Sequence, residues 1–167
     1  MTKTEEDLAA AFAGESQANR KYLAFAEQAD KDGLSQIAKL FRAAAAAETV
    51  HAHAHLRVLG GIKSTIENLK AAVGGEHHEF TEMYPGFIED AKADGNKQAE
   101  RSFNLANQVE KVHHGLYEKA LKSAEAGKDL EKTDIHVCPV CGYTHEGDLP
   151  DKCPICGVPK DKFKKIT

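Results

Sequence analysis

Apolar residues recur every three or four positions through most of residues 1–127, which is the spacing of amphipathic helices. Short glycine-containing turns divide this stretch into long segments. Four such segments joined by short turns favour a helical bundle. We therefore predict four long helices, over about 4–30, 34–59, 75–94 and 97–127, and a short connecting helix over 62–73.

The ends of these helices carry local signals. Thr4 and Asp7 have the spacing of a capping box and predict the start of the first helix. Gly60-Gly61 is expected to end the second helix. Gly74-Gly75 is expected to separate the connecting helix from the third, in which Pro85 predicts a kink.

Residues 136–167 differ from the rest of the chain. They are punctuated by glycine and proline, and they are too few to hold a core without a metal or another cross-link. We predict an all-α four-helix bundle over 1–130 and a small four-cysteine metal-ribbon domain over 136–167. The boundary is expected near 128–135.

The bulk composition excludes several classes of function. The chain has 167 residues, 41% of them hydrophobic, and a net charge of −4. With no basic block and no long apolar run, the sequence indicates neither nucleic-acid binding nor a membrane span. The polar N-terminus lacks the pattern of a secretory signal, so we expect a cytoplasmic protein.

Two polar residues interrupt the apolar face of the second predicted helix. Glu48 shares a stripe with Phe41, and His51 lies one turn further on, facing the same way. His53 lies about 140° around the helix from Glu48 and is expected in solvent or at the rim. His55 is on the core-facing side without a paired acid, so its role stays open.

The other three long helices also carry acids on apolar faces. In the fourth helix, Glu110 and His113 repeat the Glu-x-x-His spacing. Glu15 lies on an apolar stripe of the first helix, and Glu76 and Glu79 lie one turn apart in the third.

Five carboxylates on apolar faces require a compensating positive charge. One Glu from each of two helices plus Glu-x-x-His from each of the other two is the ligand pattern of a two-metal site in a helical bundle. Carboxylates with one imidazole per metal suit iron or manganese. The alternative is that these acids line a solvated groove or form surface ion pairs.

The four cysteines form two C-x-x-C pairs, Cys138 with Cys141 and Cys153 with Cys156. In a reducing compartment this spacing favours a metal site over disulfides. Four thiolates suit either zinc or a single iron. The site could therefore be a structural zinc ribbon or an iron centre that passes single electrons.

Several motifs, taken in order, resemble the rubrerythrin family across nearly the whole chain. These motifs are AFAGESQANRKY, ETVH, GEHHEFTEMYPGF, VEKVH and the pair CPVCGYTHEG…CPICG. The resemblance implies a ferritin-like bundle that holds two non-haem irons, followed by a rubredoxin-like module that holds a third iron, or zinc in recombinant protein.

The resemblance also implies roles for individual residues. Glu48 and Glu110 would bridge the two irons, Glu15 would bind the first iron, and Glu76 and His113 the second. Glu79 and His51 would exchange at the first iron, Glu79 binding when it is ferric and His51 when it is ferrous. Tyr22 and Tyr84 match tyrosines of the family that hydrogen-bond the carboxylates.

The implied reaction is the reduction of hydrogen peroxide to water, with electrons returned through the thiolate-bound iron. The ultimate donor would be an external NAD(P)H-linked reductase or a rubredoxin-type protein, since the chain has no G-x-G-x-x-G fingerprint. The rival hypotheses are a ferritin-like ferrous iron oxidase or store, and a scaffold with a zinc ribbon. Relative activity toward oxygen and peroxide stays open.

Two features depart from the family pattern. His136 stands where the family often has an aromatic residue, two positions before the first cysteine. The connection over 60–75 is also short for a chain that must cross the length of a bundle, reaching about 35 Å. We therefore expect a homodimer or higher oligomer in which helices can be exchanged between subunits.

Overall fold

The computed structural model describes residues 2–167. They fall into two compact units, one ending at Lys63 and the other spanning Ser64–Thr167.

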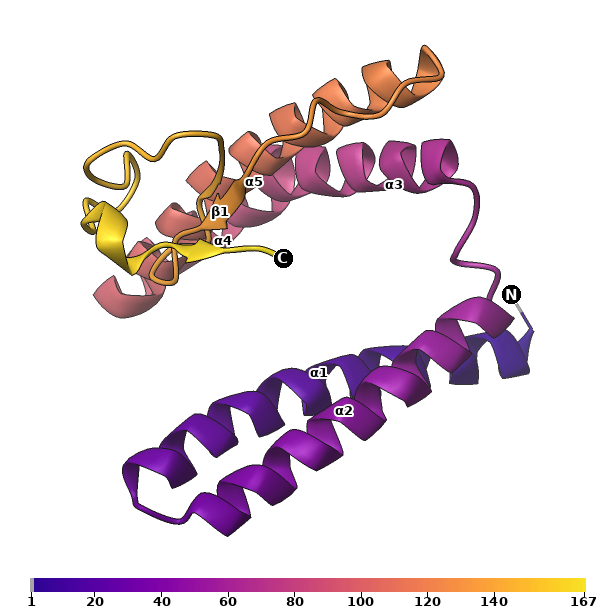
Figure 1. Ribbon diagram of the computed structural model, residues 1–167. Helices are drawn as coiled ribbons and strands as arrows, with labels where there is room; N and C mark the ends of the chain where they lie inside the picture. The colour runs from indigo at the N-terminus through magenta and orange to yellow at the C-terminus, as the bar shows by residue number, and fades with distance from the viewer. Residues whose placement is uncertain (1) are drawn as a thin grey trace. The chain divides into compact units, whose positions relative to one another are not determined.

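The first unit is a hairpin of helices α1 (Lys3–Lys31) and α2 (Ser35–Val58), drawn in indigo and purple in Figure 1. Helix α1 begins after Thr2, whose side chain and that of Glu5 form a complete capping box. The predicted Thr4–Asp7 box was therefore wrong, because an equivalent pair two residues earlier already caps the free N–H groups.

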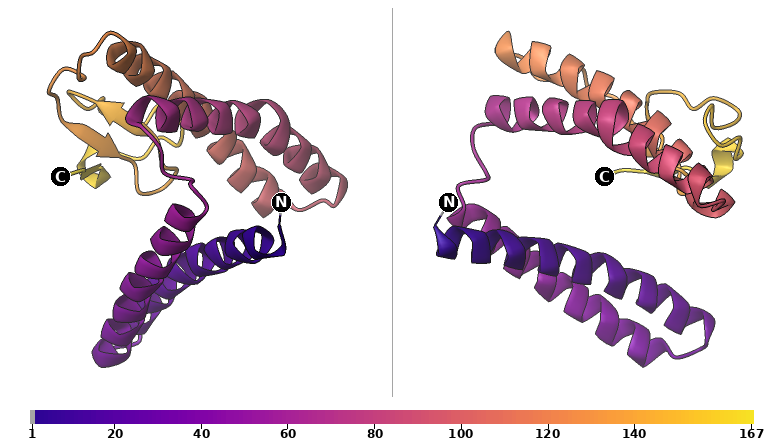
Figure 2. Two further views of the ribbon diagram at one scale, coloured as in Figure 1. Left: turned by 90° about the vertical axis from the view of Figure 1, so that its right-hand side faces the viewer. Right: turned by 180° about the vertical axis from the view of Figure 1, so that it is seen from behind.

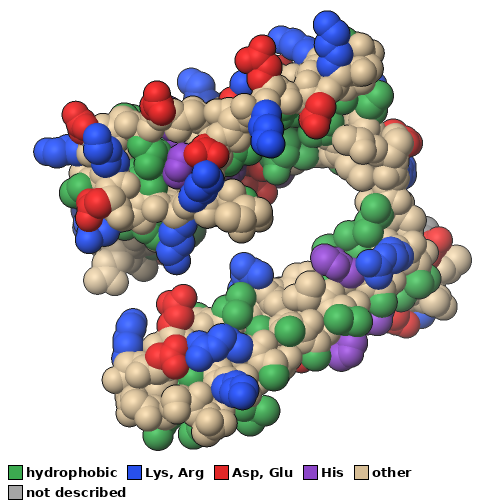
Figure 3. Space-filling view, viewed as in Figure 1, with side chains coloured by type: hydrophobic (Ala, Val, Ile, Leu, Met, Phe, Trp, Pro, Cys, Tyr) green, Lys and Arg blue, Asp and Glu red, His purple; other side chains and the backbone are tan. Residues whose placement is uncertain are grey.

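The two helices of this hairpin pack closely through small side chains. Its buried apolar residues are all alanines: Ala26, Ala29, Ala38, Ala45 and Ala52. Many of the larger apolar side chains are exposed instead, and hydrophobic side chains show along the lower helical hairpin in Figure 3. A hairpin that buries only methyl groups gains little from the hydrophobic effect, so its larger apolar residues call for a further helical surface.

The second unit begins with α3 (Thr65–His78), which runs unbroken through Gly74-Gly75. The predicted break there was wrong, and the expected connecting helix is the first part of this longer one. A capping box between Ser64 and Glu67 fixes its start. Each interior glycine costs a helix about 1 kcal/mol relative to alanine, which is too little to interrupt one that packs against a neighbour.

The helix continues as a π-helical turn, η1 (Glu79–Met83), and then as α4 (Tyr84–Ala93). The irregularity expected at Pro85 is thus a widened turn that ends two residues before it, at Met83. Helix α5 (Lys97–Glu125) returns antiparallel along α3 and α4 (Figure 1).

The rest of this unit is a small antiparallel sheet with the strand order β2-β1-β3. Its strands are β1 (Ile135–Val137), β2 (Thr144–Glu146) and β3 (Lys164–Lys165), and a 3₁₀ turn, η2 (Lys160–Lys162), precedes β3. Strand β2 contacts α5, and Figure 2 shows the sheet beside the helices of its own unit. Among residues 2–167, no helix combines the length and apolar character needed to cross a bilayer.

Candidate metal centres

The first unit gathers three of the predicted ligands. Glu15 comes from α1, and Glu48 and His51 come from successive turns of α2. The Nδ1 atom of His51 lies 2.9 Å from Glu48 Oε2 and 3.7 Å from Glu15 Oε1. One ligand atom from each residue lies within 4.8 Å of the other two.

The second unit gathers three more in nearly the same geometry. Glu76 comes from α3, and Glu110 and His113 come from α5. The Nδ1 atom of His113 lies 2.8 Å from Glu110 Oε2 and 3.8 Å from Glu76 Oε2. All six side chains predicted as conventional ligands thus fall into two matching triads, one in each unit.

The second triad is electrostatically strained without a cation. Burial, followed by the negative charges of Glu110 and Glu79, raises the pKa of Glu76 to about 7. The Oε2 atom of Glu76 is buried and has no hydrogen-bond partner among the described residues. A buried carboxylate oxygen without a donor is costly in a metal-free protein and is well placed to bind a cation.

The composition of the triads fits iron. Each triad offers two carboxylates and one imidazole, a donor set that favours iron or manganese over thiolate-seeking metals. The orphaned oxygen of Glu76 adds an observation that does not depend on the sequence pattern. The residues present therefore fit the predicted pair of metal ions.

Metal-free protein is expected to lose stability as the pH rises through about 7. The folded chain binds a proton at Glu76 more tightly than the unfolded chain, where the pKa has its ordinary value of 4.5. This contribution to stability is full below about pH 4.5 and is lost as the pH passes about 7. Thermal unfolding should show Glu76→Gln stabilising the metal-free protein at about pH 8 but not at about pH 5.

The matched control for this measurement is Glu89→Gln, because Glu89 is an exposed acid of α4, in the same unit as Glu76. It should leave the pH dependence of the unfolding midpoint unchanged. The prediction would be contradicted if the unfolding midpoints of the wild type and of Glu76→Gln differed by the same amount at every pH.

Glu79 lies beside the second triad but outside the three-residue group. Its pKa is raised by burial and then by the charge of Glu110, and is lowered by His113. The pKa of the Tyr84 hydroxyl is raised by burial and by the charges of Glu110, Glu79 and Glu76. Both side chains therefore lie close enough to the acids to sense them.

The two predicted tyrosines each belong to an aromatic trio. Tyr22 packs with Phe25 and Phe41, with ring centroids 6.3 and 6.2 Å from its own. Tyr84 packs in the same way with two phenylalanines of its own unit. The hydrogen bonds expected from these hydroxyls to carboxylates remain a prediction.

The remaining helical histidines do not join the triads. His53 is exposed, as its position on the helix predicts, and His55 is half-buried near the end of α2. The rings of His77, His114 and Phe80 form an edge-to-face and tilted cluster, with centroids 5.4 to 5.5 Å apart.

The four cysteine sulfurs form a single cluster. Cys138 Sγ lies 3.5 Å from Cys156 Sγ, and Cys141 Sγ lies 3.6 Å from Cys153 Sγ. Thiolates about 2.3 Å from one tetrahedral ion would lie about 3.8 Å apart, close to these values. The cluster therefore has the geometry of a four-sulfur metal site.

Each cysteine pair sits on a tight turn that ends in glycine. The N–H of Gly142 donates to Cys138 O and that of Gly157 donates to Cys153 O, both at 2.9 Å. Both glycines have positive φ, 86° and 78°, which a residue with a Cβ adopts only with strain. Burial alone would raise the pKa of the Cys153 thiol, but N–H groups of Cys156 and Ile155 bring it down to about 7.

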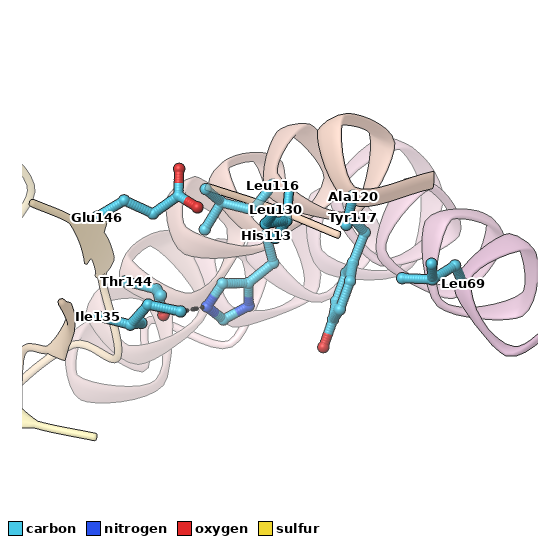
Figure 4. Close-up of a pocket in the computed structure, with 9 residues that line it drawn as sticks. All are labelled: Leu69, His113, Leu116, Tyr117, Ala120, Leu130, Ile135, Thr144 and Glu146. Carbon is cyan, nitrogen blue, oxygen red and sulfur yellow. Dashed lines mark hydrogen bonds between the residues drawn. The ribbon is translucent and has the colours of Figure 1, made fainter. Parts of the chain in front are cut away.

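A direct contact joins this module to the second triad. The Nε2 atom of His113 lies 3.0 Å from Thr144 Oγ1, and the Thr144 hydroxyl lies 3.3 Å from Gly142 O. Since the hydroxyl donates to Gly142, its oxygen is free to accept from Nε2–H, which leaves the Nδ1 lone pair available to a metal. Figure 4 shows this hydrogen bond.

The contact lies at one side of a cavity of about 260 Å³ between α3, α5 and the sheet. Leu69, Leu116 and Leu130 are among the apolar residues that line it (Figure 4). Nearby, Lys119 Nζ lies 2.5 Å from Glu146 Oε2, a second link between α5 and β2. Sequence reasoning missed Thr144, because a contact across more than thirty residues leaves no periodic signal.

Comparison with known proteins identifies relatives along the whole chain. A family model described as "Rubrerythrin" matches residues 6–121, and one described as "Rubrerythrin, rubredoxin-like domain" matches residues 136–164. A rubrerythrin-2 of Clostridium acetobutylicum is 38% identical over 96% of this chain and 95% of its own. A nigerythrin of Nitratidesulfovibrio vulgaris is 39% identical over 96% of this chain and 85% of its own.

Solved structures agree with these matches. A structure titled "Partially Reduced State of Nigerythrin" has a TM-score of 0.60 and 38% identity, covering 99% of this chain and 88% of the other. The predicted fold class, a ferritin-like helical bundle followed by a rubredoxin-like module, is confirmed.

Proposed function

Because the chain belongs to the rubrerythrin family, we propose that it is a peroxidase that reduces hydrogen peroxide to water in defence against oxidative stress. Proteins of this family are oxidoreductases that bind a di-iron site and a rubredoxin-like iron. The observation that carries the proposal is the pair of matching Glu–Glu–His triads, which together offer the donors that a di-iron centre needs.

Glu48 and Glu110 are the proposed bridging ligands. Each is the acid closest to the imidazole of its own triad, at 2.9 and 2.8 Å from Nδ1. Glu15 would complete the first half of the centre. Glu76 and His113 would complete the second.

The proposed switch uses His51 and Glu79 as alternative ligands. When bound, a pair of irons would supply the two electrons needed to reduce peroxide. An anionic oxygen from Glu79 suits the higher charge of an oxidised ion, whereas the neutral imidazole of His51 suits the reduced ion. Tyr22 and Tyr84 would hold the carboxylates in place by hydrogen bonds.

The rubredoxin-like module is the proposed route for electrons that return to the centre. Thr144 lies three residues after Cys141 and accepts a hydrogen bond from His113, so one short stretch of backbone links a sulfur ligand to an imidazole ligand. This contact favours iron over a purely structural zinc in the module. The external donor would be an NAD(P)H-linked reductase or a rubredoxin-type protein, and four free thiols suit the cytoplasm.

We further propose a homodimer in which each di-iron centre combines the α1–α2 hairpin of one chain with the α3–α5 helices of the other. Only residues 59–64 separate α2 from α3, rather than the connection over 60–75 expected from the sequence. Six extended residues reach about 20 Å, whereas α2 is about 36 Å long. A ferritin-like bundle needs a crossover along its length, which this linker is too short to provide.

The proposed function is tested by mixing anaerobically reduced, iron-loaded protein with hydrogen peroxide in a stopped-flow instrument. Wild-type protein should reoxidise rapidly. Glu79→Ala and His51→Ala should retain the metal yet slow this reaction by about a hundredfold or more, as expected when a group bound to the reacting ion is lost.

The matched controls are Glu82→Ala and His53→Ala. Both residues are exposed and lie within three positions of the residues tested. They should reoxidise like the wild type. Unchanged rates in both Glu79→Ala and His51→Ala would refute the proposed switch.

A further inference from the structure

The two helical hairpins of the chain carry the same residues at many equivalent positions. Over most of their length, equivalent residues are separated by 62 positions. The equivalent pairs include Tyr22 and Tyr84, Phe25 and Phe87, Gly33 and Gly95, Phe41 and Phe103, Glu48 and Glu110, and His51 and His113.

The geometry of the hairpins repeats as well. In the first aromatic trio, Tyr22–Phe25, Tyr22–Phe41 and Phe25–Phe41 have centroid distances of 6.3, 6.2 and 5.6 Å. The corresponding distances in the second trio are 6.2, 6.3 and 5.6 Å. The glycine turns repeat too, at Gly33 (φ 76°) and Gly95 (φ 68°).

The match fails by one residue at a single place beside the candidate centre. Glu15 lies seven residues before Tyr22, whereas Glu76 lies eight residues before Tyr84. In a regular α-helix an extra residue would turn everything after it by about 100°. Here both ends keep their partners, because Glu76 stays with Glu110 and Tyr84 stays with Phe103.

The extra residue is absorbed by the π turn Glu79–Met83, in which the N–H of Tyr84 donates to Glu79 O, five residues back. The corresponding stretch of α1 is regular α-helix. The one place where the hairpins differ in length is thus also where the second hairpin carries its additional acid. Single π turns inside α-helices often occur at functional sites.

The first hairpin has a pair of interhelical hydrogen bonds that the second lacks. Asn19, buried in α1, donates through Nδ2 to Ala45 O at 2.6 Å and to Thr49 Oγ1 at 2.8 Å of α2. The equivalent of Ala45 in α5 is Asn107, whose Oδ1 is buried without a hydrogen-bond partner among residues 2–167. The backbone before Tyr84 is therefore held less firmly than the backbone before Tyr22.

We infer that the π turn is a one-residue insertion into a repeated hairpin, and that it makes the α3–α4 helix the movable half of the metal centre. The backbone carbonyl of Glu79 closes the wide turn, so a movement of this turn would also move the Glu79 side chain. Only the role of Glu79 as a ligand rests on the proposed function. The insertion and the local mobility do not depend on it.

Deleting one residue from each hairpin tests the insertion. Removing the exposed Thr81 from the π turn restores the seven-residue spacing, so metal-free protein should keep cooperative thermal unfolding within a few degrees of wild type. Removing the exposed Gln17, two residues before Asn19, the α1 equivalent of Thr81, should destroy the register and lower the midpoint far more. Equal losses in the two variants would overturn the inference.

Amide hydrogen exchange tests the mobility directly. In wild-type protein, amides of residues 79–84 should exchange about tenfold faster than those of residues 17–22, the ratio expected when one stabilising hydrogen bond such as that of Asn19 is absent. Deletion of Thr81 should narrow this difference, because it removes the π turn but supplies no equivalent of the Asn19 hydrogen bonds. Equal exchange rates in the two wild-type segments would refute the inferred mobility of the α3–α4 helix, whatever the result with peroxide. If hydrogen exchange is as predicted but Glu79→Ala reoxidises at the wild-type rate, only the role of Glu79 as a ligand is refuted.

Discussion

Replacing Cys138 with serine is expected to unfold residues 136–167 while the helices keep their structure. Cys138 is the largest side chain in the described chain with almost no exposed surface, so this module has no apolar core that could replace the metal. The binding free energy of a four-thiolate metal is in effect the folding free energy of such a small domain. The visible ferric–thiolate band should disappear, and NMR signals of β1 and β2 should collapse to unfolded positions.

The same substitution separates the two proposed roles of iron. Protein reduced chemically before mixing should still react once with peroxide, because the helical ligands are untouched. Repeated turnover with an external donor should stop, since the electrons no longer have a route through the module. Val140→Ser, at an exposed position between Cys138 and Cys141, is the control and should leave both reactions intact. Full turnover by Cys138→Ser would contradict the relay.

The triads were predictable from sequence because helical periodicity is a strong constraint. Glu48 and His51 break an apolar stripe, and the same break recurs at Glu110 and His113, so periodicity by itself places four candidate ligands on the apolar faces of two helices. The structure brings each pair together with a third acid as that reasoning expects. The roles assigned to the individual residues remain proposals.

The features that sequence reasoning missed depend on relations between elements rather than on one helix. Gly74-Gly75 has the pattern of a break, but nothing lies within 4 Å of a Cβ built at either position, and the helix simply continues. The π turn is visible only in the spacing of Glu76 and Tyr84 relative to the equivalent spacing in the first hairpin. A pattern within one helix cannot reveal an insertion that a π turn of the same helix absorbs.

The proposed exchange of hairpins between the two chains of a dimer leads to a second prediction, which concerns the di-iron content of mixed dimers. Glu48→Ala and Glu110→Ala should each abolish the di-iron centre in homodimers, weakening iron binding by at least about a hundredfold, since even residues behind the ligands cost up to that much. A heterodimer of the two variants, made with two affinity tags, behaves differently. If hairpins are exchanged, one centre receives both altered halves and the other receives both intact halves.

Such a heterodimer should therefore recover half of the wild-type di-iron content and peroxide reoxidation. A heterodimer of Glu48→Ala with Glu15→Ala is the matched control, because both changes lie in the same hairpin and spoil one centre each. It should recover nothing. If each chain instead completes its own centre, neither heterodimer can recover, because every centre then contains one altered ligand. The comparison thus decides which chain supplies the second triad, independently of which reaction the irons perform.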